Sequence, residues 1–221
     1  MLTGIHTRSL EWNGQLEQYA VYLPKSWDGI SVLPTILYLH GFGECGTDGL
    51  RQLYIGLGRA VLNACEKWPC LIVAPQKREP EAEWADQRAW LNEMLNIVQT
   101  AYPVDLGRCS MTGLSQGGRG TIRLANQLNW TFRALAPVCP KADVQDCVEL
   151  CAGIPMWFFH GDLDEVHRVE ESINMVNALC AAGSPVKLSR FADVGHNSWD
   201  LAYNDPALAQ FLTQNFKLPA E

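Results

Sequence analysis

A serine framed by two glycines has the clearest chemical potential of any residue in the chain. Residues 113–117 read Gly-Leu-Ser-Gln-Gly, after a short apolar run and before a helix-like stretch. A serine on a tight strand-to-helix turn holds its hydroxyl clear of a sheet, where it can attack a carbonyl carbon. Glycine is needed two residues away on both sides, because a side chain there would collide with neighbouring elements. The spacing therefore predicts that Ser115 is a nucleophile.

A nucleophilic serine needs a general base, and three histidines follow Ser115 in the chain: His160, His167 and His196. His196 lies in a turn-rich loop, residues 193–199, between the last predicted strand and the last predicted helix. An imidazole on such a loop can reach back over the strand ends to the serine. We therefore predict that His196 is the base. We expect His160 to close a strand end and His167 to face solvent at the start of a helix.

Attack on a carbonyl also requires two N–H donors for the oxyanion that develops. One donor is expected from the residue after the nucleophile, Gln116. The other is expected from Phe42 in the loop that follows the first central strand, where Gly41 and Gly43 let the backbone approach closely. His40 at the start of this loop is expected to hold it in place. The pattern leaves open whether Glu44 braces the loop or is simply solvated.

These residues must be positioned by strands and helices, and the hydrophobic pattern alternates between the two. Short apolar runs predict strands buried on both faces, and amphipathic stretches between them predict helices. This alternation favours an α/β fold with a mostly parallel central sheet flanked by helices, in which ligands bind at the carboxyl ends of the strands. The predicted strands are Glu17–Leu23, Thr35–Leu39, Leu71–Ala74, Cys109–Leu114, Ala134–Val138, Met156–Phe159 and Val186–Phe191, and the predicted helices are Leu50–Ala64, Ala89–Ala101, Gly118–Leu128, Val169–Ala182 and Pro206–Phe216.

The serine turn and the order of the elements resemble the nucleophile elbow of the α/β-hydrolase fold. In that fold an acid lies between the serine and the histidine in the chain, here after the strand Met156–Phe159. Asp162, Asp164 and Glu165 all lie there. The acid commonly stands four residues after the histidine that ends the strand, which favours Asp164 and leaves Asp162 to brace the turn.

Composition excludes several classes of function. The chain has 221 residues and a net charge of −7, and no basic stripe suggests a nucleic-acid partner. Its apolar runs are far too short to span a membrane, and its N-terminus lacks the pattern of an export signal. We expect residues 1–221 to form a single domain that acts in the cytoplasm. The oligomeric state is not readable.

The chain contains eight cysteines and five histidines, but no pattern of metal ligands. No C-x-x-C or H-E-x-x-H sequence occurs, so we predict no metal and no cofactor. Most of the cysteines are expected to be buried thiols of a reduced protein, with one or two disulfides as the alternative.

Four motifs in one order resemble the phospholipase/carboxylesterase and dienelactone-hydrolase-like branch of the α/β-hydrolases. The likeness covers about residues 19–216. It implies hydrolysis of carboxylic esters, with Ser115, Asp164 and His196 as a catalytic triad. The chain departs from dienelactone hydrolase in having serine at the elbow instead of cysteine. The motifs are His40-Gly41-Phe42-Gly43-Glu44, Gly113-Leu114-Ser115-Gln116-Gly117, His160-Gly161-Asp162-Leu163-Asp164 and Gly195-His196-Asn197-Ser198-Trp199.

The same pattern bears on the substrate. Only the segment 139–153 separates two predicted strands where lids are often inserted, so no large cap domain is expected. Trp84, in the polar segment 77–88, is expected to contact a small ester substrate, with packing against the neighbouring helix as the alternative. Trp199 is expected either to line the substrate pocket or to anchor the last helix. The triad alone does not separate esters from amide, thioester or feruloyl-type aromatic ester substrates. A non-catalytic binding module is a further alternative, which the complete triad disfavours.

Overall fold

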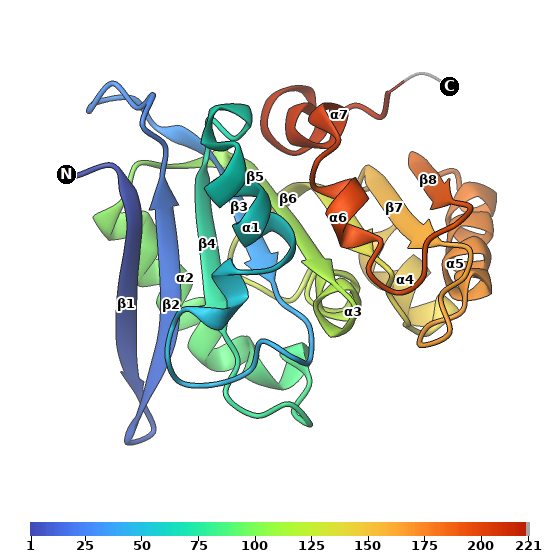
Figure 1. The fold of residues 1–221 in the computed structure, drawn as a ribbon, viewed down its shortest axis with the longest axis horizontal. Helices are drawn as coiled ribbons and strands as arrows, with labels where there is room; N and C mark the ends of the chain where they lie inside the picture. The colour runs from blue at the N-terminus through green and yellow to red at the C-terminus, as the bar shows by residue number, and fades with distance from the viewer. Residues whose placement is uncertain (220–221) are drawn as a thin grey trace.

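A computed structural model of the chain describes residues 1–219 and contains an eight-stranded sheet in the order β1-β2-β4-β3-β5-β6-β7-β8 (Figure 1). The contacts β1–β2 and β2–β4 are antiparallel, and the other neighbouring strands pair in parallel. The strands are β1 (Gly4–Trp12), β2 (Gln15–Leu23), β3 (Leu33–Leu39), β4 (Leu71–Gln76), β5 (Val104–Leu114), β6 (Phe132–Val138), β7 (Met156–Gly161) and β8 (Val186–Phe191).

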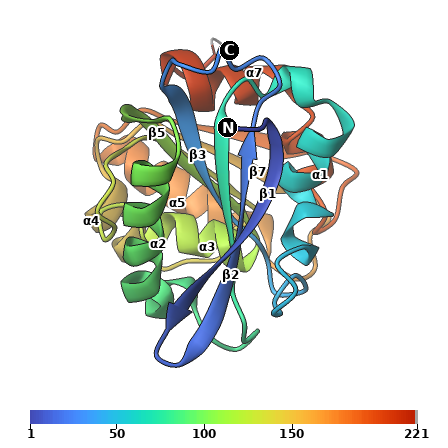
Figure 2. The same ribbon diagram turned by 90° about the vertical axis from the view of Figure 1, so that its left-hand side faces the viewer.

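Helices cover both faces of this sheet (Figure 2). Helices α2 (Arg88–Ala101), α3 (Gln116–Arg123), α4 (Val144–Cys151) and α5 (Val169–Ala181) lie on one face, and α1 (Gly56–Asn63), α6 (Trp199–Ala202) and α7 (Pro206–Gln210) on the other. The expected α/β class and mostly parallel sheet are confirmed.

The central strand β3 shows why the sheet needs two helical layers. Successive side chains point to opposite faces of a strand. Leu37 and Leu39 therefore pack with the cluster under α2, α3 and α5, whereas Ile36 and Tyr38 pack with the cluster under α1 and α7. Each of these four side chains is fully buried. A strand that is apolar on both faces is stable only between two layers, which accounts for its continuous apolar run.

The parallel register brings the carboxyl ends of β3, β5, β7 and β8 to one edge of the sheet. Tyr38 pairs with Thr112, and Phe159 pairs with Ser189, near the ends of these strands. The loops that carry the predicted oxyanion, nucleophile, acid and base residues all begin there. The fold therefore gathers, at one edge, residues that are far apart in the chain.

The sequence analysis missed β1 and misjudged two helices. Strand β1 is an edge strand with mostly exposed or half-exposed side chains, so it lacks the apolar run that revealed the other strands. The segment expected as one helix from Leu50 forms a short 3-10 turn and then α1, because Gly56 adopts φ of +55° at the junction. Helix α3 ends at Arg123, five residues before the predicted end.

No cap domain interrupts the described part of the chain. Between β6 and β7 the structure contains a loop and the eight-residue helix α4, as expected from the length of that segment. Within residues 1–219, no helix has both the length and the apolar character needed to cross a bilayer. No inserted domain between β6 and β7 of the described chain therefore covers the loops at the strand ends.

Candidate active site

Ser115 occupies a sharp turn between the end of β5 and the start of α3. Its backbone angles, φ 54° and ψ −115°, lie in a region that non-glycine residues rarely adopt. The N–H of Ser115 donates to the carbonyl oxygen of Val138 at 2.9 Å, which ties the turn to the neighbouring strand β6. Strain of this kind persists only where the surrounding structure holds it, and it is common at functional sites.

The glycines on either side of Ser115 are required by close backbone contacts. A Cβ on Gly113 would overlap the carbonyl group of Gly117, and a Cβ on Gly117 would overlap the carbonyl oxygen of Leu39. Backbone atoms cannot move away as a flexible side chain can. The two glycines therefore allow α3 to approach the ends of β3 and β5, which is what exposes the serine hydroxyl.

The side chains of Ser115, His196 and Asp164 form a continuous chain of hydrogen bonds. The distance from His196 Nε2 to Ser115 Oγ is 2.9 Å, and that from His196 Nδ1 to Asp164 Oδ2 is 2.7 Å. The structure thus brings together three residues from loops after β5, β7 and β8. If Nδ1 carries the proton that Asp164 accepts, Nε2 is free to accept the serine proton.

Asp164 is buried, but both of its carboxylate oxygens accept hydrogen bonds from the protein. Its residue exposure is 6%, and its Oδ1 accepts the backbone N–H groups of Val166 at 2.9 Å and His167 at 2.8 Å. Burial alone would raise the pKa of Asp164. The hydrogen bonds from His196 and from these two N–H groups outweigh burial and lower the pKa below its ordinary value. Asp164 therefore stays ionised beside the imidazole at neutral pH.

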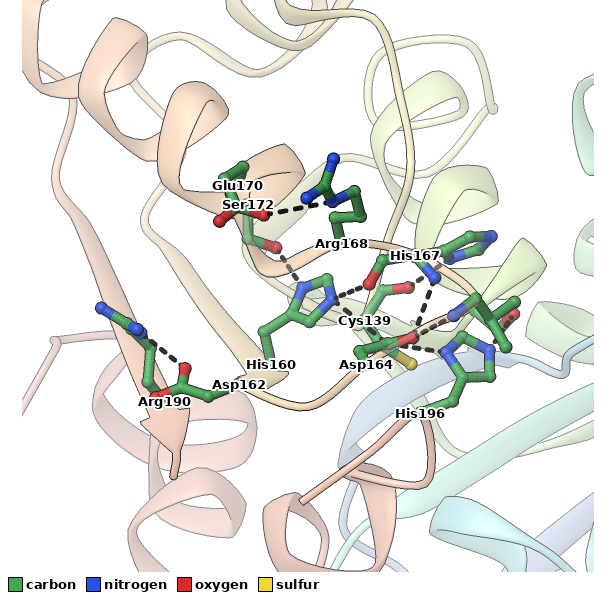
Figure 3. Close-up of polar contacts among 12 residues, drawn as sticks. Cys139, His160, Asp162, Asp164, His167, Arg168, Glu170, Ser172, Arg190 and His196 are labelled. Carbon is green, nitrogen blue, oxygen red and sulfur yellow. Dashed lines mark hydrogen bonds and ion pairs between the residues drawn. The ribbon is translucent and has the colours of Figure 1, made fainter. Parts of the chain in front are cut away.

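His160, at the end of β7, holds the loop that carries Asp164 (Figure 3). Its Nε2 lies 2.8 Å from the carbonyl oxygen of His167 and 3.2 Å from Asp164 Oδ2, and its Nδ1 lies 2.7 Å from Ser172 Oγ. A carbonyl oxygen only accepts, so Nε2 carries the proton and Nδ1 accepts from Ser172. Burial lowers the pKa of His160, which keeps the ring neutral. This geometry fits the bracing role expected for His160.

His167 differs from the expectation that it faces solvent. It is half-buried and lines the same pocket as Ser115, with its ring 5.0 Å from that of His196. Its Nδ1 donates to the carbonyl oxygen of Cys139 at 2.8 Å, which turns the ring inward from the end of the loop that carries Asp164. Sequence spacing cannot show such a contact, because Cys139 follows a different strand.

Asp162, the alternative acid, points away from the imidazole. Its Oδ1 accepts a hydrogen bond from Arg190 Nε at 2.7 Å on the protein surface (Figure 3). Glu165, the third candidate, is exposed and lines a separate surface hollow with Asp162 and Arg168. Of the three acidic residues considered, Asp164 is the one within hydrogen-bond distance of His196.

The loop after β3 lines the same pocket as Ser115. Phe42 lines the pocket with its side chain 56% exposed, and Gln116 lines it from the first turn of α3. The first N–H groups of a helix have no acceptor within the helix, so that of Gln116 is available. Glu44 accepts the N–H of Gly41 at 2.9 Å. Glu44 therefore braces the loop, which settles the alternative left open above.

His40 is a neutral structural residue beneath this loop. Its Nε2 accepts the N–H of Lys77 at 2.9 Å, so its Nδ1 carries the proton that is shared with the carbonyl oxygen of Gly41 at 2.6 Å. Burial lowers the pKa of His40 from 6.5 to about 4. A charged ring would lose its bond with Lys77 and would be costly to bury.

This shift links the stability of the protein to pH. As the pH falls from about 6.5 to about 4, His40 takes up a proton in the unfolded chain but not in the folded protein. The stability is therefore fully present above pH 6.5, and this residue alone lowers the free energy of unfolding by roughly 3 kcal/mol over the interval. The lowered pKa values of His160 and His167 act in the same direction.

We expect a His40→Gln variant to be less stable at neutral pH and to lose less stability in acid than the wild type. Glutamine cannot take up a proton, so it removes one group from the linkage. Urea unfolding of both proteins at several pH values between 7 and about 4 measures the two slopes. Parallel profiles would show that His40 does not titrate differently in the two states.

The two tryptophans predicted to contact substrate occupy different environments. Trp199 lines the pocket, with its ring 5.4 Å from that of His196 in an edge-to-face arrangement. Trp84 is fully buried, and its Nε1 donates to the carbonyl oxygen of His40 at 3.0 Å. Its indole packs against Gly120 of α3, where a Cβ would overlap it. The prediction of a rim position for Trp84 is therefore wrong, and Trp84 instead supports the start of the loop after β3 through His40.

Together these residues open onto a pocket of about 390 Å³. Its wall combines the loop after β3, Ser115, His167 and His196 with the apolar side chains of Ile55, Leu114, Val166 and Trp199. It also includes Arg119, which the sequence analysis did not single out. Arg119 lies on α3, four residues after Ser115, which directly precedes that helix. This spacing places both residues on the same side of the helix.

One group of side chains near the pocket has the donor atoms that metal ions prefer. Atoms of Cys139, Asp164 and His196 lie within 4.8 Å of one another. Burial, however, raises the pKa of the Cys139 thiol to about 12, and Asp164 and His196 already bond to each other. A cation would have to displace the thiol proton and break that bond, so this donor set fits proton transfer better than metal binding.

Comparison with protein-family models gives no match, and comparison with curated proteins gives none either. Among solved structures, the chain is similar to a thermostable esterase, with a TM-score of 0.78 and 26% identity over 94% of this chain and 62% of that one. It is also similar to a ferulic acid esterase, with a TM-score of 0.74 and 19% identity over 94% of this chain and 96% of that one. An S-formylglutathione hydrolase from Staphylococcus aureus gives a TM-score of 0.70 and 16% identity over 95% and 97% of the two chains.

The chain therefore spans less than two thirds of the length of the thermostable esterase. The likeness to the other two proteins extends over nearly all of each chain and is a likeness of fold. The fold of this chain is that of the α/β-hydrolases.

Proposed function

We propose that this chain is a serine carboxylesterase that hydrolyses small carboxylic esters through an acyl-enzyme, with Ser115, His196 and Asp164 as its triad. The observation that supports it is the hydrogen-bond chain from Ser115 Oγ through the imidazole to Asp164, at 2.9 Å and 2.7 Å. A serine placed on a strained turn and bonded to an imidazole has no evident structural purpose there. It has the arrangement that acyl transfer requires.

In the proposed mechanism, His196 Nε2 takes the hydroxyl proton as Ser115 Oγ attacks the ester carbonyl carbon. The oxyanion that forms is held by the N–H groups of Phe42 and Gln116. The imidazolium then gives its proton to the leaving alcohol, and the C–O bond to that alcohol breaks. Asp164 remains ionised throughout and stabilises the imidazolium.

Hydrolysis of the acyl-enzyme repeats the sequence with water as the nucleophile. His196 takes a proton from water, the hydroxide oxygen bonds to the acyl carbon, and the proton returns to Ser115 as the carboxylic acid leaves. Both half-reactions use the same base and the same oxyanion donors, so no additional group is required.

The structure also suggests that the substrate is small. The pocket of about 390 Å³ is lined by loops, and Phe42 at its edge is largely exposed. Each methylene of a long acyl chain that stays in water forgoes about 0.8 kcal/mol of burial. Affinity should therefore stop increasing after a few carbons.

We expect kcat/KM for 4-nitrophenyl esters to be greatest between acetate and butyrate, without a rise in rate above the solubility limit. The measurement is a series from acetate to palmitate, with 4-nitroanilides, acyl-CoA thioesters and methyl ferulate in the same panel. A maximum at long chains would contradict the short-chain proposal. Faster turnover of methyl ferulate or of a thioester would favour the alternatives, which the ferulic acid esterase and S-formylglutathione hydrolase neighbours bring into consideration.

A fluorophosphonate probe separates an enzyme from a binding module. The probe should label the protein stoichiometrically, and peptide mapping should locate the label on Ser115. An unlabelled protein, or a label on Ser110 or Ser198, would contradict the assignment.

A further inference from the structure

Among the described residues that line the pocket, Arg119 is the only arginine. It projects from α3 one helical turn after Ser115, and its backbone N–H bonds to the carbonyl oxygen of Ser115 at 3.0 Å. Its side chain is 27% exposed, so the guanidinium is partly withdrawn from water yet open to the pocket. This position is close to the atoms of the proposed reaction.

The hydrogen-bonding capacity of this guanidinium is largely unused. A guanidinium offers five N–H donors. Within residues 1–219 the recorded acceptor is Glu83, whose Oε1 lies 2.8 Å from Nη2. The Nε atom is enclosed and has no acceptor there. The enclosed Nε is out of reach of a ligand, but the partly exposed guanidinium keeps other N–H groups that can donate to an anionic acceptor in the pocket.

Glu44, His167 and His196 share the pocket wall with Arg119, and Glu83 bonds to it. Burial is the main cause that lowers the pKa of His167, and electrostatic repulsion from His196 and Arg119 lowers it further. The hydrogen bond to Cys139 and the negative charge of Asp164 act in the opposite direction. The carboxylate of Glu44, also in the lining, already accepts the N–H of Gly41. Glu83 accepts a hydrogen bond from Arg119 but does not line the pocket. It directly precedes the short 3-10 helix Trp84–Gln87.

We infer that Arg119 is a specificity-determining residue that binds a carboxylate carried by the ester substrate close to the scissile bond. The inference rests on the proposed esterase function and names a class of substrate for it. Arginine suits this task because its planar fork matches the geometry of a carboxylate. A hydrogen bond to a charged group strengthens binding by about 10- to 100-fold. We therefore expect a preference of this size for the charged ester over the neutral one.

Two pairs of esters test the inference, one for each side of the scissile bond. The first pair is 4-acetoxybenzoate and its neutral methyl ester, where the carboxylate is on the leaving group. The second is monomethyl glutarate and dimethyl glutarate, where it is on the acyl group. Wild type and Arg119→Gln are compared by the ratio of kcat/KM within each pair, so that differences in intrinsic reactivity cancel.

We expect Arg119→Gln to lower this ratio by about 10- to 100-fold for at least one pair. Arg119→Lys should restore part of the preference, because it keeps the charge and loses the fork. Arg123→Gln is the matched control: it stands one turn further along α3 and bonds to Asp146 at 3.2 Å outside the pocket. Its ratios should equal those of the wild type.

A binding measurement on the wild type keeps the test independent of the variants' folding. The products 4-hydroxybenzoate and 4-hydroxybenzamide are compared as competitive inhibitors of hydrolysis of a neutral ester, together with glutarate and glutaramide. Inhibition by a carboxylate should be at least about tenfold stronger than by its amide. Equal inhibition within both pairs, or ratios unchanged in Arg119→Gln, would overturn the inference while leaving the esterase intact. Absence of turnover for neutral and charged esters alike would instead contradict the proposed function.

Discussion

Replacing Ser115 with alanine is expected to lower kcat/KM for 4-nitrophenyl acetate by about 10⁴-fold or more. The physical reason is that the proposed mechanism loses its only nucleophile, while His196, the oxyanion donors and the pocket remain. The backbone at Ser115 is held by Val138 and by close packing around Gly113 and Gly117, and does not depend on the hydroxyl group. The variant should therefore fold, which circular dichroism and urea unfolding would show.

Ser110→Ala provides a matched control for this experiment. Ser110 lies on β5, five residues before Ser115, and its buried Oγ donates to the carbonyl oxygen of Leu212 at 2.8 Å. Its replacement should cost about 1 kcal/mol of stability and leave the hydrolysis rate near that of the wild type. Retention of a tenth of the activity by Ser115→Ala would show that another group carries the reaction.

Replacing Asp164 with asparagine is expected to lower kcat by about 10³- to 10⁴-fold. The amide keeps nearly the same shape, but it offers no negative charge to the imidazolium and favours the wrong tautomer of His196. The lowered pKa of Asp164 implies that the carboxylate is ionised throughout the working range, so the loss should persist across neutral pH. Steady-state kinetics on short-chain esters from pH 6 to 8 would measure it.

Asp162→Asn is the control for this second prediction. Asp162 is two residues away in the same loop, and it bonds to Arg190 on the surface instead of to His196. We expect this variant to change kcat little and to lower stability by at most about 1 kcal/mol, as is usual for exposed ion pairs. A larger kinetic loss for Asp162→Asn than for Asp164→Asn would reverse the assignment of the acid.

Local sequence patterns predicted the parts of this protein that local physics controls. The five-residue spacing around Ser115 identified the turn, because the need for glycine arises within a few residues of the serine. The buried strands were found because their apolar runs reflect burial on both faces. Arg119 was missed although its spacing of four residues from Ser115 was a usable signal, since helical periodicity alone places the two on one side of α3.

Long-range contacts account for the expectations that failed. Trp84 stands in a polar segment, and nothing near it in the sequence shows that its indole lies beneath Gly120 and bonds to His40. His167 turns into the pocket because of a carbonyl group at residue 139. Strand β1 gains its hydrogen bonds from β2 at the sheet edge, so its own side chains show little apolar pattern.

The sequence by itself determined the fold class, the nucleophile turn and the chain order of the candidate acid and base, because spacing, apolar runs and glycine positions report local constraints. Only the tertiary structure decided which carboxylate meets His196, which tryptophan lines the pocket and that Arg119 and His167 belong to its wall. These outcomes depend on contacts between loops from different strands. The direction of a side chain there is set by partners tens of residues away, whose positions no local pattern records.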